Sequence, residues 1–184
     1  DVRDKVDFVF AIGGYYSMVD ALRYLTTGYF RAPGDGRETP WREGKPDFVM
    51  IWRFILYNAI LIQPPRDQVA LMALAQVKMR NLDANPNPFL ENIGDEAASV
   101  YALASNGNPD RVERLIAGLP AKLRDGMRGL DLATRDLSVL KARLILVHGR
   151  DDRIIPPGES IRLAGAAPPG PRNTAGTPTW PLDM

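Results

Sequence analysis

Two short runs of apolar residues, one near each end of the chain, have the pattern of β-strands. Residues 7–12 (DFVFAI) are aromatic and β-branched and end at a pair of glycines, and residues 143–149 (RLILVHG) form the clearest strand in the sequence. Short apolar runs closed by glycine are typical of buried strands. Each run is followed by helical spacing, over residues 17–28 and 157–167. Strand–helix units of this kind predict an α/β fold with a parallel sheet.

The first of these helices has recognisable ends. Ser17 is suited to the N-cap position and Gly28 to the stop at the other end. The apolar positions that share one face are Met18, Ala21, Leu22 and Leu25.

The pattern between the two units is helical. A loop rich in Gly and Pro over residues 31–46 comes first, and a turn is expected at residues 85–88. Five helices are predicted here, over residues 47–62, 66–80, 94–108, 109–119 and 120–130. Because they stand between two sheet strands, they predict an inserted helical lobe.

The chain therefore divides into four parts. The predicted parts are a core strand and helix (1–30), a helical cap (31–135), a core strand, loop and helix (136–167), and an irregular tail (168–184). The tail is rich in Pro, Gly and Thr and has no apolar period, which is typical of a flexible end.

Composition narrows the class of protein. The chain has 184 residues, 45% hydrophobic and 24% charged, which suits one folded domain or a core with an inserted lobe. With 23 basic and 22 acidic residues its net charge is +1, so charge gives no reason to expect nucleic acid or an anionic membrane as a partner. The absence of cysteine excludes disulfides and thiolate metal sites.

The longest apolar run covers residues 48–62 and is too short to span a bilayer, which takes roughly 20 residues. Arg53 and Asn58 also interrupt it, so we expect a buried or groove-lining helix. No signal peptide is visible, and we expect a cytoplasmic location. Because Asp1 stands where an initiator Met is usual, we also expect the chain to begin partway through a protein or to be a processed product.

The candidate chemistry lies where the second strand ends. His148, the single histidine, is followed by the adjacent carboxylates Asp151 and Asp152. Functional groups collect at the carboxyl ends of the strands in a parallel sheet. A carboxylate there can orient a histidine during nucleophilic catalysis.

Each of these residues has a structural interpretation beside the catalytic one. Asp152 can be a turn residue, since Asp is common after strands. Asp151 can be a solvated turn carboxylate or a partner for Arg150 or Arg153. His148 can be a base or a metal ligand, but with no second ligand pattern around it we interpret it as a satisfied structural histidine.

The turn after the first strand carries a second set of candidates. Gly13 and Gly14 suit a close turn better than a phosphate cradle, since the chain has no G-x-G-x-x-G or G-K-[ST] and so lacks the fingerprint of a nucleotide-binding sheet. Tyr15, Tyr16 and Ser17 either border a cleft or serve in packing and capping. No base is available to activate Ser17 as a nucleophile.

The aromatic and Met-rich helices also have two interpretations. Their large apolar side chains can line an acyl pocket or form the inner faces of packed helices, which is the default. They are Phe48, Met50, Trp52, Phe54, Tyr57, Met72 and Met79.

The segment 146–156 (LVHGRDDRIIP) resembles the acid-bearing strand and loop of the α/β-hydrolase family. The family pattern is an aliphatic strand, H-G, two residues, D, two residues, then Pro. It implies that Asp152 is the catalytic acid, that Asp151 holds a variable position and that His148 is structural. The helical middle would be the cap that many members insert.

The chain departs from that family in its nucleophile and base. It has no G-x-S-x-G motif and no histidine after His148, whereas the family order is Ser, then Asp or Glu, then His. The resemblance therefore implies the C-terminal portion of a serine hydrolase, with the nucleophile, oxyanion hole and base outside this chain.

The implied activity is hydrolysis of a carboxylic ester or similar acyl bond in a small, apolar substrate, without a metal or organic cofactor. The isolated chain is expected to be inactive. The alternative is a non-catalytic, hydrolase-like module that binds an apolar ligand or a protein partner.

Overall fold

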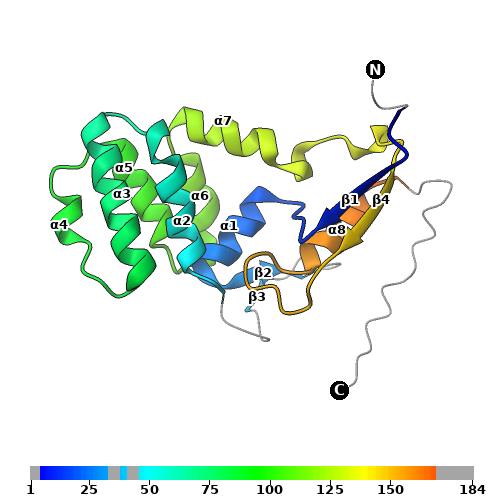
Figure 1. The fold of residues 1–184 in the computed structure, drawn as a ribbon, viewed down its shortest axis with the longest axis horizontal. Coiled ribbons are helices and arrows are strands. Elements are labelled where there is room, and N and C mark those ends of the chain that lie inside the picture. The colour runs from blue at the N-terminus through cyan, green and yellow to red at the C-terminus, as the bar shows by residue number, and fades with distance from the viewer. Residues whose placement is uncertain (1–4, 33–37, 41–45, 169–184) are drawn as a thin grey trace.

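The structure, a computed structural model, describes residues 5–32, 38–40 and 46–168 of the chain. Figure 1 shows a helical lobe at one end, a two-stranded sheet with one helix at the other, and helix α1 between them. The predicted irregular tail lies outside the described residues except for its first position, Pro168.

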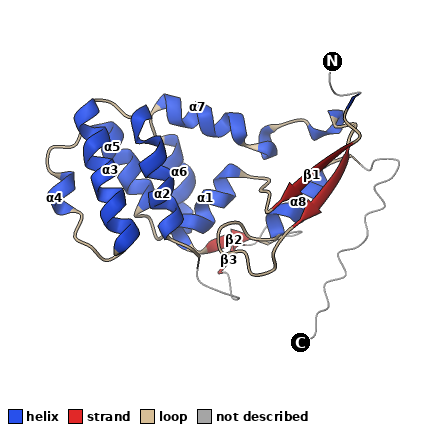
Figure 2. Cartoon of the chain, viewed as in Figure 1, coloured by secondary structure: helices blue, strands red, loops and turns tan. Residues whose placement is uncertain are grey.

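The sheet confirms the prediction of parallel strands. Strand β1 (Phe8–Ile12) pairs in parallel with β4 (Arg143–Val147), with Phe8 opposite Arg143 and Ile12 opposite Val147. The backbone N–H of Gly13 then donates to the carbonyl of Val147 at 2.9 Å. Helix α8 (Gly158–Ala166) packs on β4. The described chain is thus mixed α/β and mostly helical, as the ribbon in Figure 2 shows, and it holds only two parallel strands.

The prediction that β1 is buried is wrong. Phe8, Phe10 and Ile12 are 59%, 53% and 72% exposed. Strand β4 covers one edge of β1, and among the described residues no strand pairs with the other edge. The apolar composition of residues 8–12 is typical of a buried strand, but a sheet of two strands is too small to cover β1.

A second small sheet was missed. Strands β2 (Tyr29–Arg31) and β3 (Glu38–Pro40) pair antiparallel. β3 lies inside the loop predicted over residues 31–46, and β2 ends at its first residue. Each strand has three residues, which is too short for an apolar period to appear in the sequence.

Helix α1 (Met18–Thr27) begins and ends as predicted. The Ser17 side chain accepts a hydrogen bond from the Asp20 N–H at 3.2 Å, which satisfies one free donor of the first turn. Gly28 ends the helix with a φ of 77° and donates its N–H to the carbonyl of Tyr24 at 2.8 Å. The four predicted inward residues, Met18, Ala21, Leu22 and Leu25, are buried.

The lobe contains the predicted helices with altered limits. Its elements are α2 (Val49–Asn58), η2 (Ala59–Leu61), α3 (Pro65–Arg80), α4 (Asn87–Leu90), α5 (Asp95–Ala104), η3 (Pro109–Arg111), α6 (Val112–Ala117) and α7 (Ala121–Leu130). The predicted helix 47–62 gives way to a 3-10 turn after Asn58. Pro65 opens α3, where its missing N–H is not needed. Helix α4 begins inside the predicted turn at residues 85–88.

The lobe forms the main hydrophobic core. Helices α2 and α3 pack closely against each other, and α5 packs on both. Ile62, Leu71, Leu74 and Val112 are at most 1% exposed. Two further 3-10 turns, η4 (Leu132–Thr134) and η5 (Leu137–Val139), lead from α7 to β4. Among the described helices, none combines the length and apolar character that crossing a bilayer requires.

Candidate functional site

The loop after β4 holds the Asp152 carboxylate in a fixed position. Its Oδ1 accepts hydrogen bonds from the backbone N–H groups of Ile154, at 2.8 Å, and Ile155, at 3.0 Å. This is the local turn that Asp forms with the residues two and three positions on. The side chain is 24% exposed. These contacts are those of the turn interpretation, and they leave a fixed carboxylate with an accessible surface.

His148 lies behind this carboxylate with partners on both ring nitrogens. Nδ1 is 2.6 Å from the Ser160 hydroxyl, and Nε2 is 2.9 Å from the carbonyl of Ile155 and 3.4 Å from Oδ2 of Asp152. Because Nε2 faces two acceptors, the neutral ring carries its proton there and Nδ1 accepts from Ser160. The side chain is 3% exposed. This is the environment of the satisfied structural histidine that the sequence predicted.

The side chain of His148 thus lies in contact with both Ser160 and Asp152, an arrangement that the sequence did not predict. A serine hydroxyl beside a histidine is the geometry of an activated nucleophile. Ser160, however, is buried in the first turn of α8, and its hydroxyl also lies 3.3 Å from the carbonyl of Gly14. The contact therefore anchors α8 to the loops after both strands.

The turn after β1 passes directly beside the Asp152 carboxylate. Gly13 has a φ of 61°, and a Cβ added there would lie 3.4 Å from Oδ2 of Asp152. The carboxyl ends of the two parallel strands thus bring Gly13 and Asp152 together, although the sequence separates them widely. The close-turn interpretation of the glycine pair fits this position.

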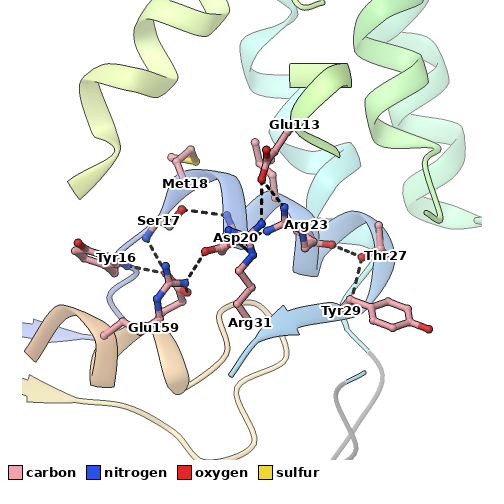
Figure 3. Close-up of polar contacts among 12 residues, drawn as sticks. Tyr16, Ser17, Met18, Asp20, Arg23, Thr27, Tyr29, Arg31, Glu113 and Glu159 are labelled. Carbon is pink, nitrogen blue, oxygen red and sulfur yellow. Dashed lines mark hydrogen bonds and ion pairs between the residues drawn. The ribbon is translucent and has the colours of Figure 1, made fainter. Parts of the chain in front are cut away.

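A buried carboxylate from α8 holds the start of α1, as Figure 3 shows. Glu159 accepts hydrogen bonds from the backbone N–H groups of Tyr16, at 2.9 Å, and Ser17, at 2.7 Å. Asp131 accepts from the N–H of Met18 at 3.2 Å. Ser17 therefore serves the capping role, and the Tyr16 ring packs against the Arg162 guanidinium, 5.3 Å from its centroid. Sequence reasoning missed Glu159 because nothing in its helix indicates a partner at the other end of the chain.

Charged side chains continue from this contact into the lobe. Arg162 contacts Glu159 at 2.9 Å and Asp20 at 2.5 Å, and Asp20 also pairs with Arg23. Arg23 in turn reaches Glu113 at 3.1 Å. Asp20 and Arg23 are almost fully buried. Buried charges of opposite sign need such pairing, so this network fixes α1 between α8 and α6.

Burial changes two proton affinities in this region. Loss of water around Glu159 raises the pKa of its carboxyl, against the lowering effects of the Ser17 and Tyr16 N–H groups and of Arg162. Burial raises the pKa of Tyr24 to about 12, and the Asp152 charge adds to this while Arg153 opposes it. Tyr24 is 0% exposed. Its phenol is therefore buried and within electrostatic range of the loop that carries Asp152 and Arg153.

An apolar cavity of about 200 Å³ begins next to the start of α1. Met18 and Leu22 line it from α1, and α2, α3, α5 and α7 form the other walls. Of the seven large apolar residues considered for an acyl pocket, Phe54 lines this cavity. Trp52 instead belongs to the core at 5% exposure, while Tyr57 is 74% exposed. The cavity follows from the packing of five helices, which the sequence alone does not define.

The known proteins give no assignment for this arrangement. No protein-family model, curated protein or solved structure matches the chain. In the part of the chain that the structure describes, no group of three or more His, Cys, Asp and Glu side chains is placed to hold a metal ion. The candidate features are thus two, the loop that carries Asp152 and the cavity among the helices.

Proposed function

We propose that this chain is the acid-bearing portion of a serine α/β-hydrolase that cleaves a carboxylic ester or similar acyl bond. The observation that carries the proposal is the position of Asp152. Its carboxylate stands at the carboxyl end of a parallel strand, held by two backbone N–H groups and partly exposed to solvent. Catalytic groups of parallel α/β sheets stand at this end.

In the proposed reaction Asp152 orients the base histidine. A carboxylate hydrogen-bonded to Nδ1–H of a histidine fixes its tautomer and stabilises the imidazolium that forms when the serine loses its proton. Oδ1 is occupied by the Ile154 and Ile155 N–H groups. Oδ2, 3.4 Å from Nε2 of His148, is beyond the usual length of a hydrogen bond to that ring, so it is the oxygen assigned to the base.

The nucleophile and base belong to residues outside this chain. The chain has no G-x-S-x-G motif, and its single histidine has both nitrogens engaged in a buried position. The 184-residue chain alone is therefore expected to show no ester turnover above buffer.

The test compares two adjacent aspartates. The expressed chain is extended along its gene in both directions, and hydrolysis of p-nitrophenyl butyrate is measured. Turnover is expected in the longer protein, with a G-x-S-x-G segment upstream, and Asp152→Ala is expected to lower kcat by about 10⁴-fold. Asp151→Ala, the exposed neighbour, is the control and should retain activity.

Three results contradict the proposal. One is equal loss of activity in the two variants. Another is turnover by the 184-residue chain that depends on Asp152. The third is a gene with no such upstream segment.

The cavity supports a second candidate function, binding of an apolar ligand without catalysis. Its volume of about 200 Å³ exceeds the roughly 150 Å³ of an engineered apolar cavity that binds benzene. Binding without turnover in the extended protein would favour this function over hydrolysis.

A further inference from the structure

The size of the cavity sets the length of an apolar ligand. An apolar cavity of about 150 Å³ binds benzene, a ligand of six carbons, so about 200 Å³ accommodates a slightly larger apolar group. An extended hydrocarbon chain of about six to eight carbons has this size. The walls suit it, because almost all of the lining side chains are aliphatic or aromatic.

The lining has one charged member, Lys122 in the first turn of α7. Among the described residues no carboxylate lies within ion-pair distance of its ammonium group. The other basic side chains of α7 have partners, since Arg124 donates to the carbonyl of Ala117 at 2.8 Å and Arg128 lies 3.9 Å from Asp125. An apolar cavity bordered by a single ammonium group is complementary to a ligand with a hydrocarbon chain and one negative charge.

We propose that this cavity binds a medium-chain carboxylic acid anion, with the hydrocarbon chain among the helices and the carboxylate at Lys122. This inference rests on the apolar-ligand function proposed for the cavity and adds the class of ligand and the residue that selects it. It holds whether the anion is the product of an ester hydrolysed at the Asp152 loop or a ligand in its own right.

Helix α7 offers a matched pair of variants for the chain-binding part. A Cβ added at Gly126, which lines the cavity, meets no atom within 4 Å, and neither does one added at Gly129. Gly129 does not line the cavity. Phe at either position is compatible with the helix, where Gly is the weaker helix former. Only Gly126→Phe places a ring in the ligand's space.

The experiment measures the affinity of the 184-residue chain for sodium octanoate and for 1-octanol by titration calorimetry. Octanoate is expected to bind more tightly than octanol. Gly126→Phe should weaken both ligands at least tenfold, and Gly129→Phe should change neither by more than twofold. Lys122→Met, which keeps a long side chain, should weaken octanoate about fivefold or more and leave octanol within twofold. Circular dichroism confirms that each variant is folded.

The contrary results are distinct. If octanol binds as tightly as octanoate, or Lys122→Met has no selective effect, the carboxylate site is wrong while apolar binding stands. If neither ligand binds, or Gly126→Phe and Gly129→Phe behave alike, both the carboxylate site and the apolar-ligand function of the cavity are wrong. The hydrolase proposal is judged by turnover and is untouched by either result.

Discussion

The carboxylate of Glu159 on α8 accepts the backbone N–H of Ser17 at 2.7 Å, although the two residues are 142 positions apart. The same carboxylate also accepts the N–H of Tyr16. One side chain thus satisfies two donors before α1 and fixes this helix against α8, the helix that packs on β4.

Removing this carboxylate should destabilise the fold. Glu159→Ala removes the acceptor of one buried and one partly buried N–H group and the partner of Arg162, and we expect the free energy of unfolding to fall by about 3 kcal/mol. Urea unfolding measures the change. Glu91→Ala, at an exposed position, is the control and should stay within about 0.5 kcal/mol. Equal effects in the two variants would show that the α8–α1 contact contributes little.

Glu159 also makes stability depend on pH. Because burial raises its pKa in the folded state, its contribution to stability is fully present below the unfolded pKa of about 4.5. The contribution is lost as the pH rises through the higher folded pKa. The free energy of unfolding should therefore fall relative to that of Glu159→Gln from about pH 4.5 upward. Urea unfolding of both proteins at a series of pH values tests this. A free energy of unfolding that rises with pH in the unsubstituted protein, relative to Glu159→Gln, would contradict it.

Tyr24 should titrate well above the ordinary pKa of a tyrosine. Its pKa is raised to about 12 by burial, with the Asp152 charge adding to the effect. An ultraviolet titration of tyrosinate should show a component at about that pH, which Tyr24→Phe removes. Tyr57→Phe, at an exposed position, should leave this component in place. Since the folded pKa is raised, the stability that depends on this proton is lost as the pH rises through it.

The turn at Gly13 should tolerate substitution poorly. Its φ of 61° is unfavourable for a side chain, and the new Cβ would stand 3.4 Å from Oδ2 of Asp152. We expect Gly13→Ala to lower the free energy of unfolding by about 1–2 kcal/mol, measured by urea unfolding. Gly149→Ala is the matched control, because its φ is ordinary and its nearest contact, Oδ1 of Asp151, is 3.8 Å away. A loss as large at Gly149 would remove the conformational explanation.

Local signals predicted local structure well. Ser17 and Gly28 bound α1 because capping depends on atoms within one turn. The parallel pairing of β1 with β4 followed from strand–helix order. The prediction that β1 is buried was wrong because the composition of a strand shows only whether it is suited to burial. Its exposure depends on the segments that cover it.

Asp152 and His148 were found as site candidates because their chemistry lies within one short motif. The contacts of Glu159 and the partner of His148, Ser160, were not found. These contacts depend on how α8 packs against loops that are distant in sequence. The cavity was missed as a defined space for the same reason, since helices from most of the chain form its walls.

The pairing of Phe8 with Arg143 has a consequence for the order of folding. Closing a long chain segment costs conformational entropy before the contact is gained, and such non-local contacts form slowly. The lobe, whose helices meet close neighbours in sequence, can assemble first and bring the two strands near each other. We therefore expect the pairing of β1 with β4 to be a late step of folding, and the turn at Gly13 to meet Asp152 at that step.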